Sequence, residues 1–372
     1  MKTIWIDGYE ANVPERVGSG QVSFELLVNI EKQDKVNKYV VLLPSLPLED
    51  LPKERDGWNY KILRPNKLWT RIAIPWAYFR AKVKPDLIFT PTHYIPQFIK
   101  AKRVAIIFDL SYLKYPQMFK KEDLYKLKNW TKYSVVSSTH LITISNSTKK
   151  DIIKNYKVPS SKITVSYPGY DETKYHPVKD AYKIAEIQEK YKISGSYIIY
   201  IGTIQPRKNL IRLINAFKKI DNLKLVIVGK IKGQGRKAWM NQDILERPSK
   251  LKIEDKVIFT DFVPAEELPF LLSGSTAFIL PSLYEGFGIP VVEAMACGVP
   301  VIVSNVSSLP EVVGKAGLLI DPLSEDQIAG AIGLITGDKK LHARLSKLAL
   351  EQAQKFSWKK MAKEVIKVLE TV

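Results

Sequence analysis

The chain has 372 residues, with 57 Lys and Arg against 38 Asp and Glu, and a formal net charge of +19. This length exceeds one ordinary hydrophobic core and predicts two domains. Its apolar runs are shorter than the roughly 20 residues that span a bilayer, and its first residues do not read as a signal peptide. A single cysteine, Cys297, excludes an internal disulfide. We therefore expect a cytoplasmic globular protein.

The positive charge is concentrated in the first part of the chain. Residues 1–170 contain 28 Lys and Arg against 15 Asp and Glu, whereas the remainder contains 29 against 23. Basic surfaces attract nucleic acid, anionic membranes or phosphorylated substrates, although a solvated lysine-rich surface explains the same charge. A nucleic-acid-binding protein would need aromatic stacking platforms or a recognition helix. Neither pattern is arranged here, so we expect no nucleic-acid partner.

Short apolar segments recur along the chain with helical patterns between them, which predicts parallel strands buried on both faces. Six occur in each half: Thr3–Ile6, Tyr39–Leu43, Leu87–Phe89, Val104–Phe108, Leu141–Ile144, Ile163–Val165, Tyr197–Ile201, Leu225–Val228, Val257–Phe259, Ala277–Leu280, Val301–Val303 and Leu318–Ile320. The pattern predicts an α/β protein with two tandem doubly wound parallel-sheet (Rossmann-like) domains. We expect domains at 1–168 and 196–354, a linker at 169–195, and a final helical segment at 355–372.

The first half carries two features typical of the carboxyl edge of such a sheet. Gly18, Ser19 and Gly20 precede a helix predicted from Val22 to Ile30, where backbone amides can cradle an anion. Asp109 follows the fourth predicted strand, at an edge where such sheets bind ligands. His93 also follows a strand, but we interpret it as a polar loop residue.

Two segments of the first half mix aromatic with basic residues, 67–84 and 114–132. This composition suits a surface that lies against anionic lipid. The alternative is that Pro75 interrupts any long helix and that the Trp and Ile side chains pack on the first sheet. Both interpretations remain open from the sequence.

In the second half, residues 202–209 (GTIQPRKN) follow a predicted strand and precede a helix expected over Asn209–Phe217. The guanidinium of Arg207 can donate two parallel hydrogen bonds to phosphate oxygens, and the ammonium of Lys208 provides a point charge for them. Pro206 stiffens this turn. The segment is therefore a candidate diphosphate-binding loop, in preference to a solvated loop.

Residues 281–300 (PSLYEGFGIPVVEAMACGVP) are the most informative segment. A glycine-rich loop with Glu285 follows a predicted strand, Pro290 marks the start of a helix, and Glu293 lies in its first turn. The amides of Phe287, Gly288 and Ile289 favour an anion at the helix start, and Gly286 and Gly288 allow close approach to the main chain. Two carboxylates beside a phosphate-sized site should hold hydroxyl groups, which suits a sugar nucleotide.

These residues resemble the signature of the family-4 retaining glycosyltransferases, two glutamates separated by seven residues. The segments 202–209, 17–20, 307–314 and 356–358 resemble other motifs of that family in kind and in order. The resemblance implies the two-Rossmann-domain glycosyltransferase B fold, with an active site in the interdomain cleft and a C-terminal helix, here 358–369, that returns to the first domain. The chain is similar to mannosyltransferases of that family.

The resemblance also implies roles for particular residues. Glu285 contacts hydroxyls of the donor sugar, Glu293 holds the ribose hydroxyls, and Lys208 holds phosphate. We expect the catalytic residues to be Glu285, Lys208, Arg207 and Asp109. The expected donor-binding residues are Gly18, Ser19, Gly202, Thr203, Arg207, Lys208, Gly229, Val263, Glu285, Gly286, Phe287, Gly288, Ile289 and Glu293.

The chain departs from the family pattern at two positions. Phe108 precedes Asp109 where many relatives have histidine, so that histidine's role cannot be transferred. Thr203 follows Gly202 where many relatives have arginine, and Arg207 is the candidate replacement.

The sequence contains no Asp-x-Asp, and its four histidines are scattered, so we expect no metal. The expected function is metal-independent, retaining transfer of a hexose of mannose or glucose type from a GDP- or UDP-sugar to a saccharide or lipid-linked glycan. A nucleotide-sugar hydrolase or epimerase of the same fold is the alternative. An anionic membrane surface, at the inner face of the membrane, is a further candidate partner.

Overall fold

The computed structural model describes residues 1–230 and 242–372, and these form two compact units. Unit 1 comprises Met1–Gly169 and Ser357–Val372, and unit 2 comprises Tyr170–Phe356. Within the described residues, no helix combines the length and the apolar character needed to cross a membrane.

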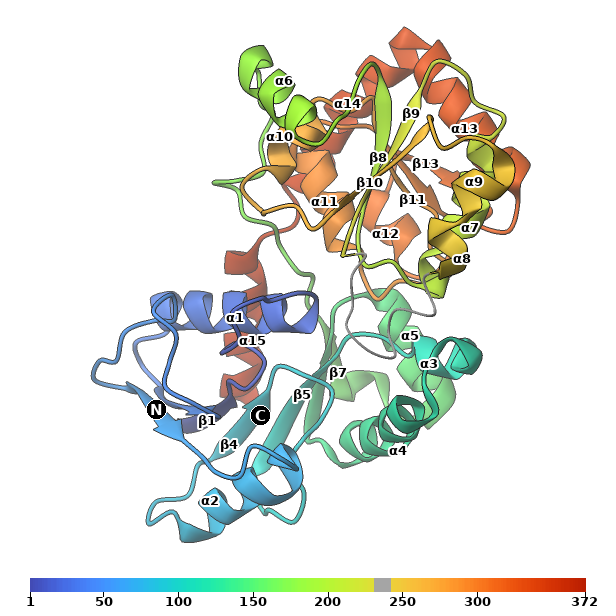
Figure 1. The fold of residues 1–372 in the computed structure, drawn as a ribbon. Helices are drawn as coiled ribbons and strands as arrows, with labels where there is room; N and C mark the ends of the chain where they lie inside the picture. The colour runs from blue at the N-terminus through green and yellow to red at the C-terminus, as the bar shows by residue number, and fades with distance from the viewer. Residues whose placement is uncertain (231–241) are drawn as a thin grey trace. The chain divides into compact units, whose positions relative to one another are not determined.

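Unit 1 is built on a seven-stranded parallel sheet with the order β3-β2-β1-β4-β5-β6-β7 (Figure 1). Its strands are β1 (Thr3–Asp7), β2 (Lys38–Leu43), β3 (Trp58–Ile62), β4 (Leu87–Thr90), β5 (Lys102–Ile107), β6 (His140–Thr143) and β7 (Ile163–Val165). Its α-helices are α1 (Ser19–Gln33), α2 (Ile74–Arg80), α3 (Ser111–Lys114), α4 (Lys121–Ser137), α5 (Asn146–Tyr156) and α15 (Trp358–Thr371). A π-helical turn, η1 (Trp69–Ala73), leads into α2, and the 3₁₀ turns are η2 (Pro116–Met118) and η3 (Ser160–Lys162).

The sheet of unit 1 contains one strand more than the six that the sequence predicts in this half. The additional strand, β3, pairs with β2 at the edge of the sheet. Its sequence, WNYKI, has a buried Trp58, while its other residues are partly or fully exposed. An edge strand of this kind lacks the continuous apolar run by which the other strands were recognised.

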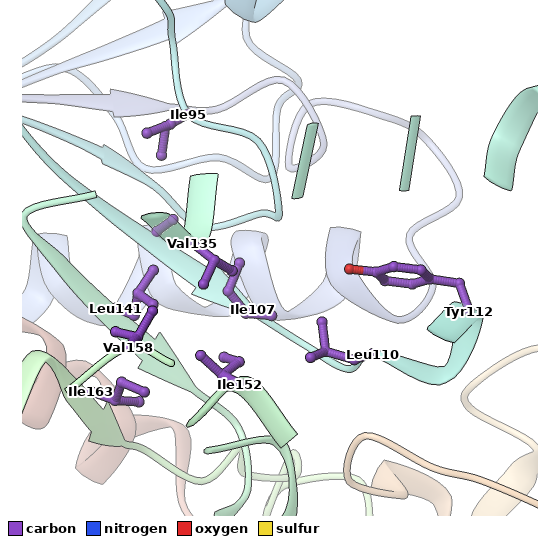
Figure 2. Close-up of a cluster of buried hydrophobic side chains, with 10 residues drawn as sticks. Ile95, Ile107, Leu110, Tyr112, Val135, Leu141, Ile152, Val158 and Ile163 are labelled. Atoms are coloured by element: carbon purple, nitrogen blue, oxygen red, sulfur yellow. The ribbon is translucent and has the colours of Figure 1, made fainter. Parts of the chain in front are cut away.

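Apolar side chains from both the sheet and its helices fill the interior of unit 1. Figure 2 shows one such cluster, in which side chains of β5, β6 and β7 meet side chains of α4 and α5. Ile107, Leu141 and Ile163 come from the three strands, and Val135 and Ile152 come from the two helices. All are buried, so this packing fixes the strand ends from which Phe108 and Asp109 emerge.

The C-terminal helix α15 returns to unit 1, as the family resemblance implies. It lies beside α1 (Figure 1), with Met361, Val365 and Leu369 buried. The side chain of Lys2 donates hydrogen bonds to the carbonyls of Leu369 and Glu370 near the end of this helix.

Unit 2 is built on a six-stranded parallel sheet with the order β10-β9-β8-β11-β12-β13. Its strands are β8 (Tyr197–Ile201), β9 (Lys224–Val228), β10 (Val257–Asp261), β11 (Ala277–Leu280), β12 (Val301–Ser304) and β13 (Gly317–Ile320). Its helices are α6 (Ala181–Lys190), α7 (Leu210–Phe217), α8 (Gln242–Leu245), α9 (Arg247–Leu251), α10 (Leu268–Ser273), α11 (Ile289–Ala296), α12 (Leu309–Val313), α13 (Glu325–Gly337) and α14 (Lys339–Ala353), with a 3₁₀ turn η4 (Pro206–Lys208).

Segment 169–195, expected to be a linker, contains α6, which packs against α10 within unit 2. Ile187 is the buried residue of this helix.

The strand order of unit 2 reverses direction at its centre. From β8 the chain moves to β9 and β10 on one side, and from β11 it moves to β12 and β13 on the other. In open parallel sheets, ligands bind at the carboxyl ends of the strands beside such a switch point. The loops that follow β8 and β11 therefore lie at the position where this architecture binds ligands.

Candidate active site

The loop after β8 starts with a close approach between two main chains. A side chain at Gly202 would bring a Cβ atom to 2.8 Å from the Tyr200 hydroxyl. A Cβ atom at Gly229, which follows β9, would lie 2.1 Å from the Gly202 carbonyl oxygen. A larger residue at Gly229 would force the ends of β8 and β9 apart, and one at Gly202 would displace the buried Tyr200 ring.

Asn209 fastens the end of this loop to the loop that follows β11. Its φ of 61° places it in the left-handed region, between η4 and α7. Its side-chain amide donates hydrogen bonds to the carbonyls of Pro281, at 3.0 Å, and Pro322, at 2.6 Å. The Leu283 amide donates in turn to the Arg207 carbonyl at 2.9 Å. These bonds hold Arg207 and Lys208 against the Glu285 loop.

Arg207, Lys208 and Glu285 form one charged cluster. The Lys208 Nζ atom lies 2.6 Å from Glu285 Oε1, and Arg207 Nη1 lies 3.4 Å from Glu285 Oε2. Arg207 also donates a hydrogen bond to the Tyr284 carbonyl. The three side chains are 13%, 17% and 8% exposed for Lys208, Arg207 and Glu285. The residues are about 77 positions apart in sequence, so the switch-point topology brings them together.

The electrostatics of this cluster favour an ionised Glu285. Burial alone would raise the pKa of its carboxyl, but the charges of Lys208 and Arg207, together with the Lys208 hydrogen bond, lower the pKa to about 2. The carboxylate is therefore negative throughout the neutral range. It neutralises part of the positive charge that would otherwise face a ligand.

Two serines after β12 hold the main chain around Glu285. The Glu285 amide donates to Ser307 Oγ at 2.9 Å, and Ser308 Oγ donates to the carbonyls of Glu285 and Phe287, both at 3.0 Å. Ser308 is fully buried, and Ser307 has a φ of 54°. The conformation of the Glu285 loop is thus fixed before any ligand binds.

The helix α11 begins directly after this loop. Gly288 precedes it with a φ of 103°, and Pro290 occupies its first turn. A Cβ atom at Gly288 would lie 3.0 Å from a Leu309 methyl group, and the positive φ also disfavours other residues. The first amides of a helix have no partners within the helix, and the helix dipole favours an anion there. The loop that carries Glu285 therefore leads directly to these amides.

Glu293 lies in a different environment from Glu285. It is half-buried on α11, beside Tyr175. Burial raises the pKa of Glu293 to about 7; the Tyr175 hydroxyl opposes this shift and the Asp171 carboxylate adds to it. One turn further along the helix, at Ala296, a cavity of about 400 Å³ opens, and Tyr175 also lines it. The structure therefore brings Glu285 to Arg207 and Lys208, and Glu293 to Tyr175.

Another predicted residue of unit 2 is Val263, which is buried just after β10. Its neighbour Phe262 is exposed, and the Lys230 ammonium lies 5.2 Å from the centre of the Phe262 ring.

Three predicted residues belong to unit 1. Gly18 precedes α1 with a φ of 54°, and Ser19 donates a hydrogen bond to the Glu10 carboxylate. Asp109 follows β5 and accepts hydrogen bonds from the amide and hydroxyl of Ser111, at 2.8 and 2.6 Å. All three lie near carboxyl ends of strands of the unit 1 sheet.

Two acidic residues at this edge, Asp7 and Glu10, were not predicted. Asp7 is the last residue of β1 and accepts hydrogen bonds from the Tyr9 amide, at 3.1 Å, and the Trp69 indole, at 2.8 Å. Burial raises the pKa of Asp7 to about 7, and burial also raises the pKa of Glu10. The available signal was the acid that ends the apolar run TIWID.

His93 lies at the same edge and stacks on Phe108, with ring centres 5.4 Å apart and planes 28° from parallel. Burial lowers the pKa of His93, while the charge of Asp109 opposes this shift. An imidazole therefore adjoins the phenylalanine that replaces the histidine of many relatives.

Across residues 1–230 and 242–372, no group of three or more His, Cys, Asp or Glu side chains is placed to hold a metal ion.

Comparisons with known proteins agree with this architecture. Residues 183–352 match the profile of glycosyl transferases group 1, and residues 38–174 match glycosyltransferase family 4. The chain is 30% identical to O-antigen chain mannosyltransferase B of Escherichia coli over 313 residues, which cover 82% of this chain and 78% of the relative.

Two solved structures show the same fold at low sequence identity. Sucrose-phosphate synthase from Thermosynechococcus elongatus matches with a TM-score of 0.80 and 19% identity, over 100% of this chain and 99% of the other. Anabaena HepE in complex with UDP-glucose matches with a TM-score of 0.77 and 19% identity over the whole of both chains. The chain therefore belongs to the family-4 glycosyltransferases, and it is a mannosyltransferase-like hexosyltransferase with the glycosyltransferase B fold.

Proposed function

We propose that this glycosyltransferase transfers a mannose- or glucose-type hexose from a GDP- or UDP-sugar, with retention of anomeric configuration and without a metal ion. The observation that carries the proposal is the Lys208–Glu285–Arg207 cluster beside the start of α11. It combines two cations with a carboxylate that remains ionised at the switch point of the sheet.

The chemistry of glycosyl transfer makes use of both signs of charge. As the bond between the anomeric carbon and the diphosphate breaks, negative charge grows on the leaving phosphate and positive charge on the sugar. Lys208 and Arg207 would stabilise the leaving diphosphate, and the first amides of α11 would add hydrogen bonds to it. Glu285 would accept hydrogen bonds from sugar hydroxyls, and its charge suits the sugar in the transition state.

Glu285 is the ion-pair partner of both cations. A diphosphate would compete for them, and the carboxylate would then turn to the hydroxyls of the sugar. Glu293, whose pKa burial raises to about 7, would bind the ribose hydroxyls. A carboxyl group can accept a hydrogen bond from a hydroxyl in either protonation state.

Similar proteins support a nucleotide sugar as the class of donor. One relative is a mannosyltransferase of O-antigen chains, and one structural neighbour is a complex with UDP-glucose. The acceptor would accordingly be a saccharide or a lipid-linked glycan, which an anionic membrane would present at its inner face. Asp109, at the carboxyl edge of unit 1, would orient the acceptor hydroxyl or the donor.

The decisive experiment incubates the protein with GDP-mannose, UDP-glucose and related donors, with and without a panel of saccharide acceptors. Nuclear magnetic resonance of the product gives the configuration of the new bond. An α-linked product from an α-linked donor supports retention, and a β-linked product would overturn it. A changed or hydrolysed sugar in the absence of acceptor would instead identify an epimerase or a hydrolase.

A further inference from the structure

The helical segment η1–α2 of unit 1 is apolar on two sides, and only one side is covered by the rest of the unit. Trp69, Ile74 and Tyr78 are buried in a cluster with Trp5, Leu42 and Ile88 of the sheet. Ile72, Trp76 and Phe79 are exposed. A helix that is apolar all round normally has both sides covered, so the outer side is expected to meet another apolar phase.

The exposed apolar side chains follow one another along this segment. Ile72, Trp76 and Phe79 recur at helical spacing, Leu68 directly precedes η1, and Val83 lies beyond the end of α2. Trp76, Phe79 and Val83 are 49%, 62% and 75% exposed. The segment remains helical through Pro75, because this proline lies in the first turn of α2, after the π-helical turn η1. Each of the two interpretations left open by the sequence therefore holds for part of the segment. Trp69 and Tyr78 pack on the sheet, whereas Trp76 and Phe79 are exposed.

A neighbouring loop adds to these exposed side chains. The Gln97 amide donates a hydrogen bond to the Thr70 carbonyl of η1, at 3.1 Å, and Ile99 is buried in the same cluster as Ile74. Phe98, between them, is 75% exposed with a φ of 61°. The loop therefore adds a further exposed aromatic ring, next to η1.

The chain segment that carries these exposed side chains is rich in basic residues. Residues 57–108 contain ten Lys and Arg and one acidic residue, Asp86. The Asp86 carboxylate accepts a hydrogen bond from the Thr3 amide, at 2.8 Å. Arg80 stacks on Trp76, with its guanidinium carbon 4.7 Å from the ring centre, and Lys82 and Lys84 follow directly. Cations are therefore placed next to the exposed rings.

The adjoining helix α4 continues this positive surface. The Arg71 guanidinium carbon lies 4.1 Å from the ring centre of Trp130, and the Lys126 ammonium lies 5.9 Å from the same ring. Lys128 and Lys132 of α4 are exposed.

We propose that the outer face of η1–α2, with Phe98, is the surface by which unit 1 docks on an anionic lipid bilayer. We define this docking face by Leu68, Ile72, Trp76, Phe79, Val83 and Phe98. Its apolar side chains enter the boundary between headgroups and acyl chains, and Arg80 and Lys82 contact the headgroups. This proposal depends on the proposed function in one respect: the purpose of the docking face is to bring the enzyme to a lipid-linked acceptor.

The test is flotation with vesicles in the absence of donor and acceptor. Vesicles of phosphatidylcholine and phosphatidylglycerol should carry the wild-type protein upward at low salt, and vesicles of phosphatidylcholine alone should carry much less. Trp76→Ser with Phe79→Ser should lower the partition coefficient at least tenfold. Arg80→Gln with Lys82→Gln should lower it by about fivefold for each cation, and high salt should reproduce this loss.

Matched controls lie in unit 2. Tyr182→Ser with Leu334→Ser removes two exposed apolar side chains, and Lys339→Gln with Lys340→Gln removes two exposed cations. Neither control should change flotation, and circular dichroism of all variants should show the wild-type fold.

Three results would overturn the docking face: no flotation of the wild type, equal losses in the controls, or self-association that Trp76→Ser with Phe79→Ser abolishes while vesicles leave the protein unbound. The last outcome would identify a second copy of the chain as the occupant. Transfer to a soluble acceptor, measured separately, tests the proposed function, so the two can fail independently.

Discussion

Glu285 at the carboxyl edge of the unit 2 sheet and the two acids at the carboxyl edge of the unit 1 sheet have opposite electrostatic settings. In unit 2, Glu285 is paired with Lys208 and Arg207, and its pKa falls to about 2. In unit 1, Asp7 and Glu10 have neutral hydrogen-bond donors as partners, the Trp69 indole and the Ser19 hydroxyl, and burial raises both pKa values. The first edge suits a ligand with negative charge. The second suits neutral hydroxyl groups.

The largest expected effect is that of Glu285→Ala, which should abolish transfer. The same change should leave nucleoside diphosphate affinity unchanged or higher, because it removes the carboxylate that is paired with Lys208 and Arg207. Steady-state assays and titration calorimetry measure the two quantities. Glu285→Gln, which keeps the size of the side chain, controls for disruption of the loop. A parallel loss of diphosphate affinity in both variants would contradict the assignment to the sugar.

Lys208→Ala should lower kcat by roughly two to three orders of magnitude, the scale of one lost contact to charge that develops in the transition state. Lys219→Ala is the matched control, because Lys219 forms an exposed ion pair with Asp326. If the two variants had similar turnover, the cation at η4 would have no catalytic role.

Glu293→Ala should weaken nucleotide binding by about 1–3 kcal/mol, the range for a buried hydrogen bond to a charged group. Calorimetry with nucleoside diphosphate and with free diphosphate separates the ribose from the phosphates, and only the first affinity should fall. Unchanged affinity for the nucleotide would rule out the ribose contact.

Asp7→Asn tests the other edge through the pH dependence of stability. Because burial raises the pKa of Asp7 from 3.8 to about 7, the folded state holds a proton that the unfolded state releases above about pH 4. This contribution to stability is therefore lost as pH rises through about 7. Between about pH 5 and about pH 8, the free energy of unfolding of the wild type should therefore fall by roughly 2 kcal/mol more than that of the variant.

Urea unfolding at the two pH values measures this difference. Asp50→Asn is the control, because Arg16 lowers the pKa of Asp50 and its titration lies below this window. If the free energy of unfolding changed equally between the two pH values in the wild type and in Asp7→Asn, Asp7 would be ionised in the folded protein at neutral pH.

The smallest effect is expected for EDTA, which should leave the rate unchanged if Lys208, Arg207 and the amides of α11 supply the positive potential. Rates are compared before and after chelation, and again after addition of manganese or magnesium. Loss of activity with EDTA, and recovery with either metal, would show that an ion supplies this charge.

The sequence predicts the fold well where strands are buried on both faces, because such strands are continuous apolar runs. It fails at β3, whose edge position leaves polar residues within the strand. Glu285, Arg207 and Lys208 were each predicted as site residues, but their contact was not, since it depends on β8 and β11 being neighbours. Asp7 and Glu10 were missed because isolated acids are common at strand ends, and only burial distinguishes them.

The return of α15 to unit 1 has a consequence for the order of folding during synthesis. A Cβ atom at Gly169 would lie 2.1 Å from the Trp358 amide nitrogen, so the start of α15 sits directly on the end of the first segment. Unit 2 is continuous in sequence, whereas unit 1 needs residues from both sides of it. The ribosome therefore completes every residue of unit 2 before unit 1 receives its last helix. Until then, the face of α1 that packs against α15 lacks this helix.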